Sequence, residues 1–239
     1  MISSLRLGFD PEFAPLTWAE AGRPVGRAIE IVRAASADAG ITLELVPVGL
    51  GAPGSGVELR LDGFACMAVT PGRTDFTFSV PYLTTAAALF FARRKVGRQE
   101  PAELGEPAGG GTGIAVATPG AGPLYDLLSE KAATGRPADD HSPVAVARVA
   151  PGTDYRDCLG RVLRGEVDAA ALNAEVGRAM VARLFPGAFV ERPAPLPDLG
   201  LAVALTGNRQ DAEFMLSRLD PALESVVREI RTGTTPARP

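Results

Sequence analysis

Short apolar segments of strand length alternate with amphipathic helical segments along most of the chain, and this alternation limits the fold to the α/β class. Residues 4–10 alternate apolar and polar side chains and stop at a proline, as a strand followed by a loop does. Residues 26–40 begin and end with glycine and place apolar residues at helical spacing, and residues 41–48 form the next apolar segment. A strand, a helix and a strand in this order predict a parallel crossover.

The same alternation restarts after a polar stretch at residues 98–113 that is rich in glycine, proline and glutamate. Further strands are predicted at 59–70, 83–94, 113–117, 144–150, 166–173 and 198–205. Further helices are predicted at 124–133, 155–165, 174–185 and 211–233, the last one broken or restarted at Pro221. Residues 11–25 are predicted to form a loop, and the glycine-rich residues 49–56 a flexible turn rather than a phosphate cradle.

Composition excludes several classes of function. The 239 residues are 46% hydrophobic and 22% charged with a net charge of −4, which fits one large or two modest globular domains and disfavours a nucleic-acid partner. One histidine and two distant cysteines, Cys66 and Cys158, indicate neither a metal site nor a redox motif, and they leave open whether the cysteines pair. We therefore expect no metal and no cofactor.

No apolar run is long enough to span a bilayer, and the first residues lack the pattern of a secretion signal. Two interpretations remain open from these residues: a cytoplasmic protein, or a secreted protein whose signal has been removed.

A lone cation, Arg73, follows the apolar strand predicted at 59–70 after a Thr-Pro-Gly turn. Ligands of α/β proteins bind at the carboxyl ends of strands, where a guanidinium offers a two-pronged donor to a carboxylate. The alternative is a surface ion pair with Asp75, which would contribute little to stability.

Several motifs, in order and over nearly the whole chain, resemble the extracellular solute-binding proteins of family 3, which include the amino-acid receptors of ABC importers. The most specific run is T-P-x-R followed by F-S-x-P-Y, and the others are G-x-D-x-x-F-x-P-L, G-x-x-x-E and G-x-x-D-A. The matching residues are Gly8, Asp10, Phe13, Pro15, Leu16, Gly26, Glu30, Thr70, Pro71, Arg73, Phe78, Ser79, Pro81, Tyr82, Gly165, Asp168 and Ala169.

This resemblance implies a two-lobed type II periplasmic-binding-protein fold, with two Rossmann-like lobes joined by two crossover strands that close on a small ligand. On this interpretation residues 1–92 and 197–239 form the first lobe, and residues 93–196 form the second. It also implies a monomer that works in the periplasm or elsewhere outside the cytoplasm, binds a small carboxylate-bearing ligand and delivers it to an ABC permease.

The resemblance implies that Arg73 binds the ligand carboxylate and that Phe13 packs on the ligand. Asp10 is either a cap of the loop or a polar group of the site, and Cys66 and Ala68 stand where such receptors carry small polar residues. In the second lobe, the turn after strand 113–117 is expected to offer backbone N–H groups to an anion. The residues of that turn are Thr118, Gly120 and Ala121, and a hydroxyl found in the family is absent from the Gly120-Ala121 pair.

Asn173 stands where the family usually has an aspartate for the ligand's ammonium group. An amide offers only a neutral carbonyl, so we expect a carboxylate without a free amine, a neutral polar compound, or an amino acid bound in another pose. Glu175 either supplies the missing charge or is a solvated residue of a helix start.

Two further functions remain open on the same fold. One is an enzyme similar to cyclohexadienyl dehydratase, which would need an acid–base carboxylate, with Glu175 the candidate nearest Asn173. The other is a ligand-sensing module of a larger protein. We expect a binding protein without catalytic residues.

Overall fold

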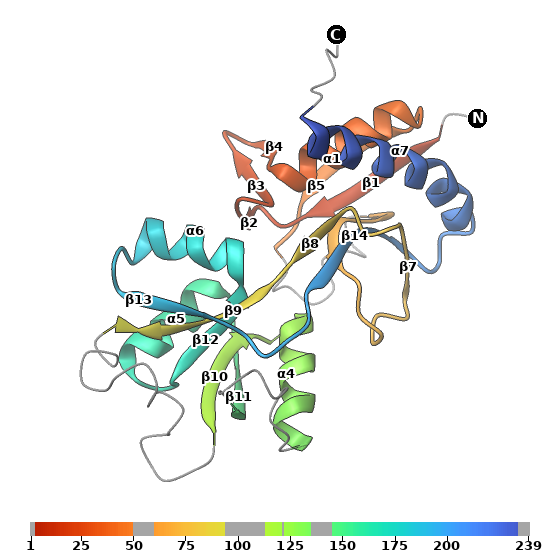
Figure 1. The fold of residues 1–239 in the computed structure, drawn as a ribbon. Coiled ribbons are helices and arrows are strands. Elements are labelled where there is room, and N and C mark those ends of the chain that lie inside the picture. The colour runs from red at the N-terminus through yellow and green to blue at the C-terminus, as the bar shows by residue number, and fades with distance from the viewer. Residues whose placement is uncertain (1–2, 50–59, 94–112, 121, 135–144, 234–239) are drawn as a thin grey trace. The chain divides into compact units, whose positions relative to one another are not determined.

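The computed structural model describes residues 3–49, 60–93, 113–120, 122–134 and 145–233 (Figure 1). The chain divides into two compact units: Met1–Thr84 with Leu199–Pro239, and Thr85–Asp198. The glycine-rich turn predicted at 49–56 and the polar stretch at 98–113 lie almost entirely outside the described residues. None of the described helices combines the length and apolarity that a membrane span requires.

The sheet of the first unit is mixed. Its strands run in the order β5-β1-β6-β14-β7, with β8 also paired to β14. The bounds are β1 Ser4–Phe9, β5 Thr42–Pro47, β6 Gly63–Ala68, β7 Phe76–Phe78, β8 Leu83–Thr85 and β14 Leu199–Thr206. β1 runs parallel to both β5 and β6, which confirms the crossover predicted from the sequence, whereas β14 runs antiparallel to β6.

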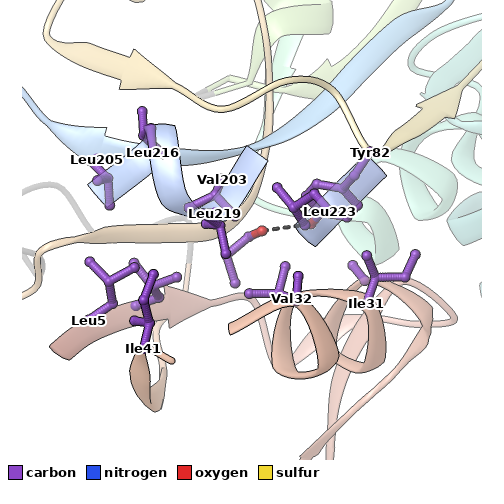
Figure 2. Close-up of a cluster of buried hydrophobic side chains, with 14 of the residues drawn as sticks. Leu5, Ile31, Val32, Ile41, Tyr82, Val203, Leu205, Leu216, Leu219 and Leu223 are labelled. Atoms are coloured by element: carbon purple, nitrogen blue, oxygen red, sulfur yellow. Dashed lines mark hydrogen bonds between the residues drawn. The ribbon is translucent and has the colours of Figure 1, made fainter. Parts of the chain in front are cut away.

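Two helices, α1 (Arg27–Asp38) and α7 (Ala212–Thr232), contribute to the core of this unit. In Figure 2, Leu216, Leu219 and Leu223 of α7 gather with side chains of α1, β1 and β14. These leucines recur at three- and four-residue spacing, which places them on one helix face. The predicted break at Pro221 is wrong: α7 continues through it, with buried leucines on both sides.

The predicted loop at 11–25 is instead a three-stranded antiparallel ribbon of β2 (Glu12–Phe13), β3 (Thr17–Glu20) and β4 (Arg23–Val25). Its strands of two to four residues are too short to give a readable alternation. The ribbon ends at Gly26, whose φ of 120° and close approach to the carbonyl of Leu16 suit glycine alone.

The second unit has a five-stranded sheet in the order β11-β10-β12-β9-β13. The strands are β9 Ala87–Ala92, β10 Ile114–Pro119, β11 Val146–Gly152, β12 Ala169–Asn173 and β13 Phe189–Pro193; the helices are α4 Pro123–Thr134, α5 Tyr155–Arg164 and α6 Ala174–Leu184. β10 runs parallel to β11 and β12, so the carboxyl ends of these three strands lie along one edge.

Strand β9 belongs to the second unit, although the sequence placed residues up to 92 in the first lobe. β9 pairs with β12 and β13 through registers such as Ala169 with Phe91 and Phe189 with Ala92. All six of its residues are buried. An apolar strand without alternation fits the centre of a sheet that is covered on both faces, and its neighbours in space are distant in sequence.

We predict that Gly63→Ala destabilises the protein. A Cβ at Gly63 would overlap the carbonyl oxygen of Ala204 on the neighbouring strand, so one of the two backbones must move. The expected loss in the free energy of unfolding is about 1–3 kcal/mol, measured by urea denaturation. Gly72→Ala is the matched control, because a Cβ there meets open space. Equal stability of the two variants would contradict the prediction.

Candidate functional site

The carboxyl ends of β1 and β6 form the edge of the first sheet where ligands of α/β proteins bind. The two strands are parallel neighbours, with Leu7 opposite Gly63 and Gly8 opposite Phe64. Continuing this register sets Asp10 beside Cys66; burial raises the pKa of the Cys66 thiol, and the charge of Asp10 raises it further. Several predicted site residues of the first lobe therefore share one edge.

Arg73 is tied to the end of β6. Its Nη1 donates to the carbonyl oxygen of Ala68 at 3.0 Å, and its backbone N–H donates to Thr70 O at 3.2 Å to close the turn. The side chain is half-buried. A guanidinium carries five N–H donors in a fixed plane, and this hydrogen bond orients the group. Ala68 thus contributes its carbonyl group, and its own side chain is buried.

Asp10 caps a turn with one oxygen of its carboxylate. Oδ1 accepts the backbone N–H of Glu12 at 2.9 Å, and the backbone carbonyl of Asp10 accepts the Thr17 hydroxyl at 2.8 Å. Burial raises the pKa of the Asp10 carboxyl, the hydrogen bond from Glu12 N–H lowers it, and the charge of the Glu12 carboxylate raises it again. The carboxylate is therefore poorly compensated inside the protein.

Cys66 and Tyr82 lie together below this edge. Burial raises the pKa of the Cys66 thiol to about 12 and that of the Tyr82 phenol well above its usual value. The Tyr82 hydroxyl donates to Ala65 O at 2.6 Å. Cys66 is a free thiol, and so is Cys158, which is buried in the second unit, so the two do not pair. A thiol with so high a pKa stays neutral and presents a soft, weakly polar surface.

Phe13 lies in β2, opposite Thr17 of β3, and is half-buried. It follows Asp10 by three residues, and its carbonyl accepts the N–H of Leu16 at 3.0 Å. The ribbon therefore fixes the backbone of Phe13 near the end of β1.

In the second unit, Thr118 lies near the end of β10 with its side chain fully buried. Its Oγ1 has no hydrogen-bond partner among the described residues. The backbone N–H of Gly120 already donates to Gly152 O at 3.0 Å. Helix α4 begins at Pro123, which has no N–H to offer. Ala121 lies outside the described residues. Thr118, rather than Gly120, has an unused donor at this turn.

Asn173 ends β12 and caps α6. Its Oδ1 accepts the backbone N–H groups of Glu175 and Val176, both at 3.1 Å, and its Nδ2 donates to Thr85 Oγ1 at 2.6 Å. The side chain is buried. Its carbonyl oxygen is therefore already used by the helix, as at other N-caps. Thr85 had no signal in the sequence, because its role depends on a partner 88 residues away.

Two acidic residues near Asn173 have other functions. Arg178 pairs with Glu191 at 2.8 Å, and this hydrogen bond raises the pKa of Arg178; the charge of Glu175, one turn earlier on α6, adds to the same effect. Asp168 accepts the N–H of Ala115 through Oδ2 at 2.9 Å and so joins β12 to β10. The aspartate of the G-x-x-D-A motif thus holds two strands in register.

The described residues contain no group of three or more histidine, cysteine, aspartate or glutamate side chains that could hold a metal ion.

Comparison with protein families gives one match: the profile of the bacterial extracellular solute-binding proteins, family 3, aligns with residues 5–230. No curated protein matches the chain.

Solved structures match over nearly the whole chain. An arginine-bound mutant of ArgBP from T. maritima has a TM-score of 0.66 and 19% identity, with 94% of this chain and 96% of that chain covered. An ancestral arginine-binding protein bound to glutamine has a TM-score of 0.69 and 18% identity, covering 98% and 95%. AncCDT-1, an ancestral amino acid-binding protein and precursor of cyclohexadienyl dehydratase, has a TM-score of 0.67 and 20% identity, covering 97% and 92%. These matches confirm the type II periplasmic-binding-protein fold.

We predict that Asp10→Asn stabilises the ligand-free protein at pH 7. Burial raises the pKa of this carboxyl above the ordinary 3.8, so the folded state disfavours the charge. The gain should be full above the raised pKa, shrink as the pH falls through it and vanish below 3.8, where both states are protonated. Urea denaturation at a series of pH values measures it.

The control for this prediction is Glu20→Gln, since Glu20 is exposed on β3. Asparagine can still accept the N–H of Glu12, so the turn is kept. A variant that is less stable than the parent by the same amount at every pH would show that Asp10 acts only as a cap.

Proposed function

Because the chain belongs to the bacterial extracellular solute-binding proteins of family 3, we propose that it binds a small solute through a carboxylate held by Arg73. Membership in this family makes the chain a ligand-binding receptor that works outside the cytoplasm, and not an enzyme. The proposal concerns the ligand, the residues that bind it and the protein that receives it.

The observation that carries the proposal is the position of Arg73. The side chain follows β6 at the binding edge of the sheet, and its hydrogen bond to Ala68 O orients the guanidinium. A guanidinium matches a carboxylate with two parallel hydrogen bonds, which are about twice as strong as neutral ones. The half-buried setting reduces screening by solvent and strengthens this pairing.

Each unit offers further candidate residues of its own. In the second unit, the Thr118 hydroxyl, which has no partner among the described residues, is a proposed donor in place of the hydroxyl that is lacking at Gly120 and Ala121. Phe13 and the neutral thiol of Cys66 provide weakly polar surface for the ligand's carbon chain.

Two of the similar structures support a ligand of amino-acid size. One binds arginine and another binds glutamine, and both ligands carry a carboxylate. We propose that this chain is a monomer that delivers its ligand to an ABC permease. The permease would recognise the ligand-bound conformation, which the ligand stabilises because it binds that conformation more tightly.

We predict that Arg73→Ala abolishes the thermal shift produced by carboxylate ligands while the fold is retained. The measurement is a thermal-shift screen of amino acids, keto acids, other carboxylates and amines, because ligands of the folded state raise its melting temperature. Loss of a charge-assisted bidentate pair costs about 1.5–3 kcal/mol of binding free energy, which weakens binding about tenfold to a hundredfold.

Arg33→Ala is the matched control for this experiment. Arg33 lies exposed on α1, where its guanidinium donates to the backbone carbonyl of Pro24 at 3.3 Å. The control should keep the full shift. A carboxylate ligand that stabilises the Arg73→Ala variant as strongly as the parent would remove Arg73 from the site.

A further inference from the structure

Tyr82 has no part in the proposed ligand contacts, yet it is hydrogen-bonded to two strands of the first sheet. Its backbone N–H donates to Leu201 O on β14 at 3.0 Å, and its hydroxyl donates to Ala65 O on β6 at 2.6 Å. The side chain is 3% exposed, and Figure 2 shows it among the buried side chains of the core. Tyr82 therefore joins two neighbouring strands inside the first unit.

The pairing of β6 with β14 contains a β-bulge. Met67 stands opposite Ala202, and Phe64 stands opposite Ala204. Three residue steps along β6 therefore match two steps along β14, so β6 carries one extra residue between these two pairs. A shift of one residue exchanges the two sides of a strand, so the bulge determines which way the rest of β6 faces.

Ala65 and Cys66 form this bulge. Both pack against the same hydrophobic core, whereas successive residues of a regular strand point to opposite faces. A bulge interrupts the ladder of backbone hydrogen bonds, and a buried carbonyl without a donor is costly. The Tyr82 hydroxyl supplies a donor to the Ala65 carbonyl, and the Cys66 thiol hydrogen-bonds the same phenol. Tyr82 thus stabilises the bulged conformation of β6.

The bulge is followed by the peptide unit that holds Arg73. The Val69 N–H donates to Gly200 O on β14 at 2.9 Å. In a trans peptide the preceding carbonyl points the opposite way, so Ala68 O points away from β14. There it accepts a hydrogen bond from Arg73 Nη1 at 3.0 Å. Without the extra residue, the strand beyond the bulge would be turned over and this carbonyl would no longer face the guanidinium.

We infer that Tyr82 is a positioning residue for Arg73: its hydroxyl stabilises the bulge, and the bulge directs the Ala68 carbonyl to the guanidinium. The consequence for binding rests on the proposed function, whereas the orientation of Arg73 can be measured without a ligand. Tyr82 acts on Arg73 only through the backbone of β6.

The test follows the reaction of phenylglyoxal with individual arginines of the ligand-free protein by mass spectrometry. Phenylglyoxal attacks guanidinium groups, and the hydrogen bond to Ala68 O protects that of Arg73. Tyr82→Phe removes the hydroxyl and keeps the ring. It should raise the labelling rate of Arg73 about threefold to tenfold, the range expected for the loss of one hydrogen bond. The rate of Arg33 on α1 should stay unchanged.

Thr206→Val is the matched control. The Thr206 hydroxyl donates to Asp62 O at 3.2 Å, just before β6 begins, so this variant also deletes a side-chain hydrogen bond beside that strand. It should lower the melting temperature without changing the labelling rate of Arg73. An equal rise of that rate in both variants would show that Arg73 responds to any loss of stability, and the inference would fail.

Gly200→Ala tests the same peptide unit from β14. A Cβ at Gly200 would lie 2.9 Å from Pro81 Cβ, so the carbonyl that accepts the Val69 N–H must shift. This variant should also raise the labelling rate of Arg73. A rate equal to the parent's in Tyr82→Phe overturns the inference. Should Tyr82→Phe fail to fold, the parent's rate in Gly200→Ala overturns it instead.

Calorimetric titration distinguishes this inference from the proposed function. The probes are glutarate, 2-oxoglutarate and glutamate, which share one carbon chain and differ only at carbon 2. Those that bind the parent should bind Tyr82→Phe about threefold to tenfold more weakly, because a misdirected guanidinium loses a hydrogen bond to the carboxylate. If the labelling of Arg73 changes and these affinities do not, Tyr82 positions Arg73 but the proposed carboxylate contact fails. The labelling rates decide the inference whether or not a probe binds.

Discussion

The parallel pairing of β1 with β6 is the constraint on which the first unit's candidate site depends. It brings the carboxyl ends of two strands more than fifty residues apart in sequence to one edge, so that Asp10 follows one strand and Arg73 is held at the end of the other. Gly63 permits this pairing to coexist with the antiparallel β14 on the other side, because a side chain would collide with the backbone of Ala204. A residue without a side chain thus helps determine where the charged residues lie.

Each unit holds a polar group in an unfavourable setting. In the first, burial raises the pKa of the Asp10 carboxyl, and in the second, the Thr118 hydroxyl is buried without a partner among the described residues. Polar groups in such settings destabilise the folded protein, and proteins retain them mainly where a ligand completes their bonding. By contrast, the Asp168 carboxylate accepts a backbone N–H of the neighbouring strand, as expected of a residue with a structural role.

Much of the fold was predictable from local patterns. The helices α1, α5 and α6 follow from apolar spacing and glycine or polar ends, and the parallel crossover from β1 through α1 to β5 follows from their order. The membership of β9 was not predictable, because six consecutive buried residues fit the centre of either sheet. The ribbon at 12–25 was also not predictable, because strands of two to four residues are too short to show an alternation of apolar and polar residues.

The same division applies to the candidate site. Arg73 could be found from its motif and from the strand that precedes it, because both are local in sequence. The state of Asp10 could not, since the sequence does not show that its carboxylate caps the turn at Glu12 and that burial raises its pKa. Asn173 required its distant contacts as well: only the structure shows that its carbonyl oxygen is already used by two N–H groups of α6.

Asn173 caps α6 with a neutral amide, and the type of residue at this cap sets the charge at the start of the helix. Asparagine and aspartate both cap helices well, so the fold tolerates either residue at this position. They differ in the charge that remains for a ligand, because an aspartate could cap α6 with one oxygen and bind a cation with the other, whereas the second atom of asparagine is a donor that here bonds Thr85. The exchange of one oxygen for an N–H group therefore keeps the cap of α6 and removes a negative charge from the start of this helix.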